Sequence, residues 1–412
     1  MNLFITNIGQ LVTVASNGKR CKTGKQMREL HILENAALLI ENGIIKKIGN
    51  ANELKPVEDI DVVDVEGKVV LPGFVDSHTH TVFAGSREHE FAMRAEGKTY
   101  QEIAEAGGGI LSTMNATREA SKRDLYRLAE RRLTDMLRHG TTTIEIKSGY
   151  GLSPEAEMKI LEVMNDLKRD HYATLVTTFL GAHAFPPEYK NDHNGYVEKI
   201  CNYMLPYIAE RNLAMFVDVF CEKGYFDLHQ TEQIILEAKT HGLIPKLHAD
   251  QLSSFGAAEL GAKHNAISVD HLEQLTDASI EVLKNSQTVA TVLPAASFFL
   301  NHPYAPARKI IDAGIPLAIA TDFNPGSAMC YSMQIMLTIA CTQMHMTPEE
   351  AITAATLNGA AALGLSQEVG SIEVGKQADV VVYDVKDYRY IPYHFGVNHV
   401  WKVVKNGVVL EF

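Results

Sequence analysis

The sequence predicts an α/β protein with a (β/α)8 TIM barrel and a small β-sandwich domain built from both ends of the chain. Eight short apolar runs alternate with stretches that carry apolar residues at helical spacing. Both ends carry short strand-and-turn patterns, and neither end is long enough to bury a stable core alone. We therefore predict a composite β-sandwich domain from 1–67 and 374–412, with the barrel domain over 68–373.

The apolar runs place the eight barrel strands near 69–76, 141–146, 173–180, 215–220, 243–248, 266–270, 288–293 and 316–321. Apolar residues at helical spacing predict helices over 124–139, 154–169, 231–241 and 277–284. In a barrel of this type the catalytic groups lie at the carboxyl ends of the strands.

At the chain ends, strands are predicted at 3–5, 37–40, 44–48, 62–65, 378–384 and 400–410, and Asn406-Gly407 is typical of a hairpin turn. A further segment, 81–121, is long for a connection between a barrel strand and its helix. It contains three consecutive glycines from Gly107 to Gly109. A lid or substrate wall and an oligomer contact are equally compatible with it.

The composition excludes several classes of partner and location. The 412 residues are 46% hydrophobic and 21% charged, which is typical of a globular protein with a large core. A net charge of -12 with no basic run argues against nucleic acid and anionic membranes as partners. Five cysteines without Cys-x-x-Cys spacing favour reduced thiols. With no signal-peptide pattern and no long apolar window, we expect a cytoplasmic protein.

The first barrel strand is followed by His78 and His80. Residues i and i+2 of an extended chain project to the same face, so both imidazoles can reach one metal ion. Histidine pairs of this kind are common on exposed strands that bind nothing, and a catalytic metal site needs at least one further ligand. The other strand ends supply candidates, namely Lys147 to Tyr150, His183, His248, His271 and Asp322.

This arrangement of His-x-His, His, His and Asp over strands one, five, six and eight resembles the amidohydrolase superfamily. The stretches 71–80 and 370–379 are similar to the first strand of that superfamily and to its return into the β-sandwich. Four local motifs, at 81–87, 146–152, 179–183 and 321–327, resemble the imidazolonepropionase family more specifically. That resemblance implies hydrolysis of the small molecule 4-imidazolone-5-propanoate to N-formimino-L-glutamate in histidine degradation.

The resemblance also implies roles for individual residues. One divalent metal ion, zinc or iron, would be held by His78, His80, His248 and Asp322. The catalytic residues would be His271, Asp322 and Gln251, with the first two managing protons. Many relatives carry Glu at the position of Gln251, and a glutamine cannot shuttle protons. Either the protons move through His271 and Asp322, or this position mainly orients the substrate.

The substrate-binding set implied by the resemblance is Arg87, Tyr150, His183, Gln251, Asn324, Gly326 and Ser327. Arg87 offers a bidentate fork to the substrate carboxylate, or it forms a surface salt bridge with Glu88 or Glu90. Gly326 permits a close backbone approach, or it makes a turn.

Three further residues have two interpretations each. Asp250 and Asp270 are either orienting groups behind the metal ligands or, as we favour, solvated loop carboxylates. Lys223 is interpreted as a solvated or structural lysine and not as a bridge between two metal ions, so we expect a mononuclear site.

Two other functions remain compatible with the sequence. One is a different amidohydrolase that acts on a cyclic amide or removes ammonia from a ring, and the other is a metal-free assembly protein on the same fold. We also expect a homodimer.

Overall fold

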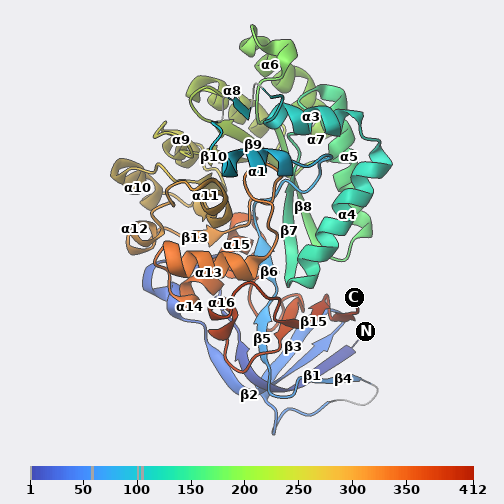
Figure 1. Cartoon of the computed structure of the whole chain (residues 1–412). Helices are drawn as coiled ribbons and strands as arrows, with labels where there is room; N and C mark the ends of the chain where they lie inside the picture. Colours follow the sequence, from blue (N-terminus) through green and yellow to red (C-terminus); the bar gives the residue numbers. More distant parts are fainter. Residues whose placement is uncertain (1, 57–59, 100–101, 104–105) are drawn as a thin grey trace.

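The chain folds into a parallel barrel and a second, mixed sheet at one end of the molecule (Figure 1). The computed structural model describes residues 2–56, 60–99, 102–103 and 106–412. Within these residues each of the two sheets contains eight strands, so the predicted barrel and the sheet composed from both chain ends are confirmed. No helix in the described ranges has the length and apolar character needed to cross a membrane.

The barrel strands follow one another in sequence order, and every neighbouring pair is parallel. Their bounds are β6 Phe74–Asp76, β7 Thr141–Lys147, β8 Thr174–Ala182, β9 Phe216–Cys221, β10 Ile244–Ala249, β11 Ser268–His271, β12 Val289–Val292 and β13 Leu317–Ile319. A parallel bridge between Thr79 and Phe323 joins the segments that follow β6 and β13. This bridge closes the barrel at its carboxyl end.

Helices surround the barrel, and a large hydrophobic cluster fills the space between the helices and the strands (Figure 1). Their bounds are α1 Glu88–Ala95, α3 Ile110–Glu119, α4 Lys122–Arg138, α5 Pro154–Asp170, α6 His193–Lys199, α7 Leu205–Glu210, α8 Leu228–Thr240, α9 Ala257–Lys263, α10 Asp277–Lys284, α11 Pro294–Leu300, α12 Ala307–Asp312, α13 Met333–Gln343, α14 Pro348–Ala355, α15 Leu357–Ala362 and α16 Tyr390–Tyr393. Shorter helical turns are η1 Gly24–Arg28, η2 Pro187–Tyr189 and η3 Ile200–Met204.

Helix starts are marked by capping residues that the sequence carries. The Ser153 side chain accepts a hydrogen bond from the Ala156 amide at the start of α5, whose first residue is Pro154. Asp227 and Gln230 form a reciprocal capping box at the start of α8. These local interactions satisfy backbone amides that have no partner inside the helix.

The second sheet combines strands from both chain ends in the order β16-β15-β14-β5-β1-β2-β3, with β4 paired to β1. The bounds are β1 Asn2–Val12, β2 Ile32–Glu41, β3 Ile44–Asn50, β4 Asp61–Asp64, β5 Val69–Pro72, β14 Val380–Tyr383, β15 Val400–Lys405 and β16 Val408–Leu410. Asn406 and Gly407 both have positive φ, as the predicted hairpin turn between β15 and β16 requires. The pairing makes one continuous sheet with its own hydrophobic cluster.

The first predicted barrel strand, 69–76, is divided in the structure. β5 pairs with β1 and β14 of the terminal sheet, and only β6 joins the barrel. Gly73 lies at the division, where a Cβ atom would be 2.1 Å from Oγ1 of Thr142. We therefore propose that the composite domain extends through β5.

The long segment 81–121 contains α1 and α3, while 100–101 and 104–105 of the predicted lid lie outside the described residues. Figure 1 shows α1 at the end of the barrel where β9 and β10 finish. The segment therefore contributes to the wall of the barrel mouth.

Candidate active site

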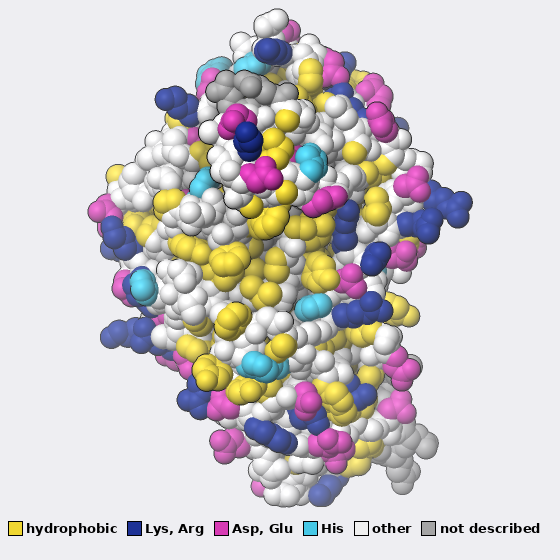
Figure 2. All heavy atoms as spheres, in the orientation of Figure 1, with side chains coloured by type: hydrophobic (Ala, Val, Ile, Leu, Met, Phe, Trp, Pro, Cys, Tyr) yellow, Lys and Arg dark blue, Asp and Glu magenta, His cyan; other side chains and the backbone are white. Residues whose placement is uncertain are grey.

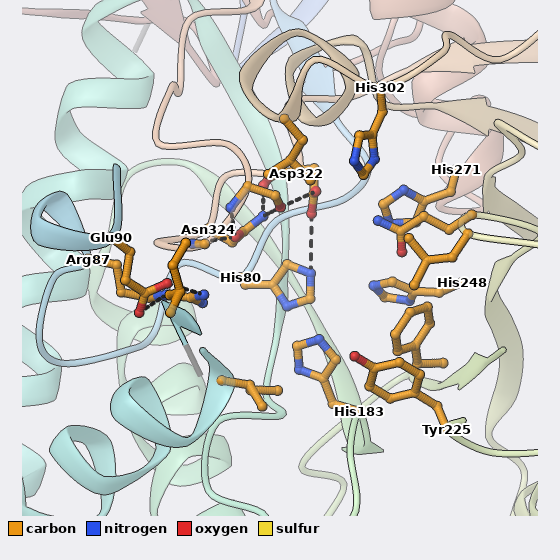
Figure 3. Close-up of a pocket in the computed structure, with 18 of the residues that line it drawn as sticks. His80, Arg87, Glu90, His183, Tyr225, His248, His271, His302, Asp322 and Asn324 are labelled. Atoms are coloured by element: carbon orange, nitrogen blue, oxygen red, sulfur yellow. Dashed lines mark hydrogen bonds and ion pairs between the residues drawn. The ribbon is translucent and has the colours of Figure 1, made fainter. Parts of the chain in front are cut away.

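A cavity of about 650 Å³ opens at the carboxyl ends of the barrel strands (Figure 3). The predicted site residues that line it are His80, Arg87, Tyr150, His183, His248, Gln251, His271, Asp322, Asn324, Gly326 and Ser327. His78, the remaining predicted residue, is fully buried, and its ring centroid lies 4.5 Å from that of His248. The fold thus brings the whole predicted set to one place.

Closure of the barrel brings Asp322 to the histidine pair. The Asp322 amide donates to the His78 carbonyl at 3.0 Å, and the His80 amide donates to the Phe323 carbonyl at 2.9 Å. As a result, Asp322 Oδ1 lies 3.5 Å from Nε2 of His78 and 3.4 Å from Nε2 of His80. Asp322 has a φ of 53°, a strained conformation for a non-glycine residue that is common at functional sites.

Buried carboxylates face the far sides of two of the histidine rings. Asp270 Oδ2 lies 2.7 Å from Nδ1 of His78, and Asp218 Oδ2 lies 3.0 Å from Nδ1 of His248. An ionised carboxylate only accepts, so Nδ1 of His78 carries the proton and its Nε2 keeps a lone pair. Within the described residues, Nε2 of His78 and Nε2 of His248 are buried and have no hydrogen-bond partner.

Burial and neighbouring charge set the protonation of this group. Burial lowers the pKa of His78 well below its ordinary value, with Lys147 contributing, and it also lowers the pKa of His248. Burial alone raises the pKa of Asp322, but the hydrogen bond from His80 and the surrounding histidines bring it below its usual range. Neutral imidazoles beside an ionised carboxylate are the state in which these side chains bind a metal.

The donor atoms fit a metal ion by position as well as by charge. Ligand atoms of His78, His80 and Asp322 lie within 4.8 Å of one another, and so do those of His78, His248 and His271. The two groups share His78. Imidazole and carboxylate donors in such an array suit a divalent transition metal.

A charged cluster lies beneath the histidines inside the barrel. Lys147 Nζ is 2.7 Å from Oε1 of Glu145 and 2.8 Å from Oδ2 of Asp218. Lys246 Nζ is 3.6 Å from Glu145 and 3.6 Å from Asp270, and all five side chains are fully buried. A third group with metal-ligand spacing, His78, Asp218 and Asp270, therefore already has two ammonium groups beside its carboxylates.

His271 has an unusual backbone and a carboxylate neighbour. Its φ is 86°, and its Nδ1 lies 3.4 Å from Oε1 of Glu273. Burial alone lowers the pKa of His271, but the charge and hydrogen bond of Glu273 raise it above the ordinary value. The imidazole therefore combines a fixed position with an increased tendency to hold a proton.

His183 and Tyr150 form an aromatic wall beside His80. The His183 and His80 rings are stacked with centroids 5.2 Å apart, and the Tyr150 centroid is 5.4 Å from that of His183. Burial lowers the pKa of His183 well below its ordinary value. His183 Nδ1 lies 3.0 Å from the carbonyl of Gly149, which only accepts, so neutral His183 keeps an acceptor at Nε2.

Arg87 forms an ion pair with Glu90 in the cavity wall, where Glu90 is buried and Arg87 is largely buried (Figure 3). Arg87 Nε donates to Oε1 of Glu90 at 2.9 Å, and Nη2 donates to Oε2 at 2.8 Å. The Gly109 amide also donates to Glu90, whose side chain is 2% exposed. Glu90 therefore fixes the orientation of the guanidinium.

The loop from Asp322 to Ser327 is held together by Asn324. Its Nδ2 donates to the Asp322 carbonyl and to Ser327 Oγ, and its Oδ1 accepts from the amides of Gly326 and Ser327. A Cβ atom on Gly326 would be 2.4 Å from Nη1 of Arg87. At Gly326 the absence of a side chain thus lets the Arg87 side chain come close to the backbone.

The two aspartates that we interpreted as solvated are both buried, and that interpretation is wrong. Asp270 faces His78, as its alternative interpretation required. Asp250 accepts from four successive backbone amides, those of 255–258, and caps the start of α9. Lys223 is exposed, as expected.

Several residues of the site were not singled out from the sequence. Asp218 interrupts an otherwise apolar strand, which was an available signal of a buried functional carboxylate. Glu273 had no comparable signal. His302, which the sequence did not single out, also lies in the cavity wall (Figure 3).

The chain is similar to known proteins over its whole length. It is 45% identical to an imidazolonepropionase from Christiangramia forsetii over 411 residues, which is 100% of both chains. It is 48% identical to an imidazolonepropionase from a Geobacillus species, over 99% of this chain and 97% of that protein.

More distant comparisons agree with the superfamily. A model of the amidohydrolase family matches residues 225–410. Escherichia coli guanine deaminase has the same fold, with a TM-score of 0.76 at 16% identity over 100% of this chain and 99% of that one. Full-length identity to the curated relatives is decisive, and the chain belongs to the imidazolonepropionase family of amidohydrolases.

Proposed function

We propose that this protein hydrolyses 4-imidazolone-5-propanoate to N-formimino-L-glutamate in histidine degradation. The names of the full-length relatives support this activity. The observation that carries the proposal is a single cavity that combines a buried His and Asp cluster with a fixed arginine, Arg87. The cluster matches hydrolysis of a ring amide, and the cation matches the carboxylate tail.

We propose His78, His80, His248 and Asp322 as the ligands of one divalent metal ion, zinc or iron. Such an ion, when bound, lowers the pKa of a water molecule and polarises a carbonyl oxygen. The buried ammonium groups of Lys147 and Lys246 already lie beside the carboxylates of Asp218 and Asp270, which supports a single ion. Elemental analysis should therefore find about one ion per chain, and two tightly held ions would contradict the mononuclear site.

The remaining side chains manage protons and position the ring. Oδ2 of Asp322, the oxygen turned toward Ser327, accepts a proton from the attacking water. The amide C–N bond breaks as the water oxygen bonds to the carbonyl carbon, and the ring nitrogen takes a proton from His271. Gln251 and the acceptor Nε2 of His183 hold the ring by hydrogen bonds, with Tyr150 against its face. We propose that Asn324, Gly326 and Ser327 form a loop whose surface contacts the substrate, and that the hydrogen bonds of Asn324 hold this loop in place.

The test is incubation of the metal-loaded protein with freshly generated imidazolonepropionate. We expect the substrate absorbance to fall as formiminoglutamate forms in equal amount. An ammonia assay on ring amidines, together with a panel of other cyclic amides, runs in parallel. Ring opening without ammonia supports the proposal, whereas ammonia release or turnover of another ring alone would assign a different amidohydrolase activity. Bound metal with no turnover of any substrate would favour a non-catalytic role.

The predicted homodimer and cytoplasmic location stay predictions. Figure 2 shows hydrophobic side chains gathered across the middle of one face, at the level of α11 and α13 in Figure 1. Phe298 on α11 and Tyr393 on α16 are 66% and 78% exposed. We propose that a second copy of the chain covers this face and these two exposed side chains. Light scattering coupled to size-exclusion chromatography tests it, with Phe298→Ser and Tyr393→Ser expected to yield monomers.

A further inference from the structure

In the protein without substrate, Arg87 already forms an ion pair with Glu90. Two of its nitrogens form a bidentate pair with Glu90, and its third nitrogen, Nη1, lies against Gly326. The charges of Arg87 and Glu90 cancel. A substrate carboxylate that met this pair alone would face a neutral unit, and the negative charge of Glu90 would offset part of the attraction.

A second guanidinium also lies close to Gly326. Arg94, in the last turn of α1, lines the same cavity, and its Nη1 donates to the Gly326 carbonyl at 3.2 Å. Its guanidinium carbon lies 5.1 Å from the centroid of the Phe299 ring. These contacts hold the Arg94 guanidinium at the cavity wall. Both arginines are therefore close to the same residue, Gly326.

The Nη2 atom of Arg94 is buried and makes no hydrogen bond to the chain across the residues that the structure describes. Unpaired buried donors are uncommon because losing water without a replacement costs about 1–3 kcal/mol. Burial lowers the pKa of Arg94, and the neighbouring charge of Arg87 lowers it further. The described residues therefore leave one buried donor of Arg94 without an acceptor.

The charges in this part of the cavity wall do not cancel. Arg87, Arg94 and Glu90 together carry one net positive charge, which the negative charge of one substrate carboxylate would balance. Lys98, the next cation along the chain in the cavity wall, is already 3.5 Å from Glu102. The unmatched charge thus resides on the arginine pair.

We propose that Arg94 is a specificity-determining residue, which binds the carboxylate of the substrate through Nη2 while Arg87 supplies the second donor. This inference rests on the proposed function and names the part of the cavity that receives the tail. Glu90 then fixes the Arg87 guanidinium, and the Gly326 carbonyl holds that of Arg94. A substrate without the carboxylate leaves Nη2 unpaired and is discriminated against.

The test compares Arg94→Met and Arg94→Lys on two substrates, imidazolonepropionate and its neutral propionamide. For Arg94→Met we expect kcat/KM on the carboxylate substrate to fall roughly 10- to 100-fold, mainly through KM, as for a lost hydrogen bond to a charged group. The propionamide should change little. Arg94→Lys should recover part of the loss because it keeps the charge.

Lys98→Met is the matched control, since it removes a positive charge from the same wall without touching the arginine pair. If Lys98→Met lowers the preference for the carboxylate substrate as much as Arg94→Met does, the overall positive potential of the cavity, and not binding by Arg94, selects the carboxylate. That result would overturn the proposal. Equal losses on both substrates for Arg94→Met would assign Arg94 a structural role.

A binding measurement separates this inference from the proposed activity. Calorimetry with imidazolepropionate and its amide, neither of which contains the ring amide to be hydrolysed, reports the tail site without turnover. Failure of the wild-type protein to open the imidazolone ring would reject the activity only. A wild-type protein that binds the acid no better than the amide would reject the role of Arg94.

Discussion

Asp270 Oδ2 lies 2.7 Å from Nδ1 of His78, and neither side chain is exposed to solvent. This contact fixes the ring orientation and directs the unpartnered Nε2 toward the other predicted ligands. Replacing the partner of a metal-binding histidine typically lowers metal affinity or activity by roughly 10- to 100-fold. The contact therefore gives the first prediction.

Asp270→Asn should weaken metal binding by roughly 10- to 100-fold, because the amide holds the imidazole less firmly and lowers its basicity. Affinity is measured by competition with a chromophoric chelator. Asp250→Asn is the matched control, since Asp250 is also buried but caps α9. It should lower the melting temperature, by loss of about 0.5–2 kcal/mol, and leave metal affinity unchanged. Equal metal affinities in the two variants would contradict the assignment.

The second prediction separates proton transfer from ring orientation. His271→Ala should reduce kcat on the order of 10²-fold or more, because it removes a fixed imidazole that carries a proton. Gln251→Ala should reduce kcat far less, since an amide side chain transfers no proton. Steady-state kinetics on imidazolonepropionate, with metal content measured for each variant, gives the comparison. Similar losses with metal retained would mean that the roles are misassigned.

The third prediction concerns the contact between Gly326 and Arg87. Gly326→Ala places a Cβ atom 2.4 Å from Nη1 of Arg87, which the bidentate bond to Glu90 keeps from moving aside. We expect KM for the carboxylate substrate to rise on the order of 10-fold, as for a weakened charged hydrogen bond, with metal content unchanged. Gly49→Ala in β3 is the control, because its new Cβ meets only ordinary contacts at 3.7 Å. An unchanged KM would show that Arg87 does not hold the tail.

The fourth prediction concerns stability and pH. Burial alone raises the pKa of Glu373, but hydrogen bonds from Ser371 and Ser16 outweigh it and lower the pKa from 4.5 to about 2. The native state then binds fewer protons than the unfolded state between these values. The contribution of Glu373 to stability is therefore complete above pH 4.5 and is lost as the pH falls toward 2.

Glu373→Gln should accordingly lower the melting temperature at pH 7, and the difference from the wild-type protein should shrink steadily below pH 4.5. Thermal unfolding followed by circular dichroism from pH 7 to pH 3 measures it. Glu368→Gln, which changes an exposed carboxylate of the same segment, should show no such trend. A difference that stays constant with pH would rule out the carboxylate charge as the cause.

The sequence by itself determined the barrel, the chain-end strands and most of the candidate site. Alternation of apolar runs with helical spacing depends on residues close together in the chain, so seven of the eight barrel strands could be placed with small errors at their ends. Of the first predicted strand, 69–76, only the last part joins the barrel. His78 and His80 share a face because the period of a strand is two. Motifs at four strand ends then identified the family.

Only the tertiary structure decided which carboxylates belong to the site. Asp250 and Asp270 each neighbour a site histidine in sequence, yet one caps a helix and the other orients His78. Likewise Glu90 follows Arg87 by three residues, and the sequence does not show that the pair is buried beside Gly326. The physical reason is that burial depends on parts of the chain that only folding brings together, such as His78 against Asp270 and Gly326 against Arg87. Burial and the partners of a side chain then set both its charge and its direction.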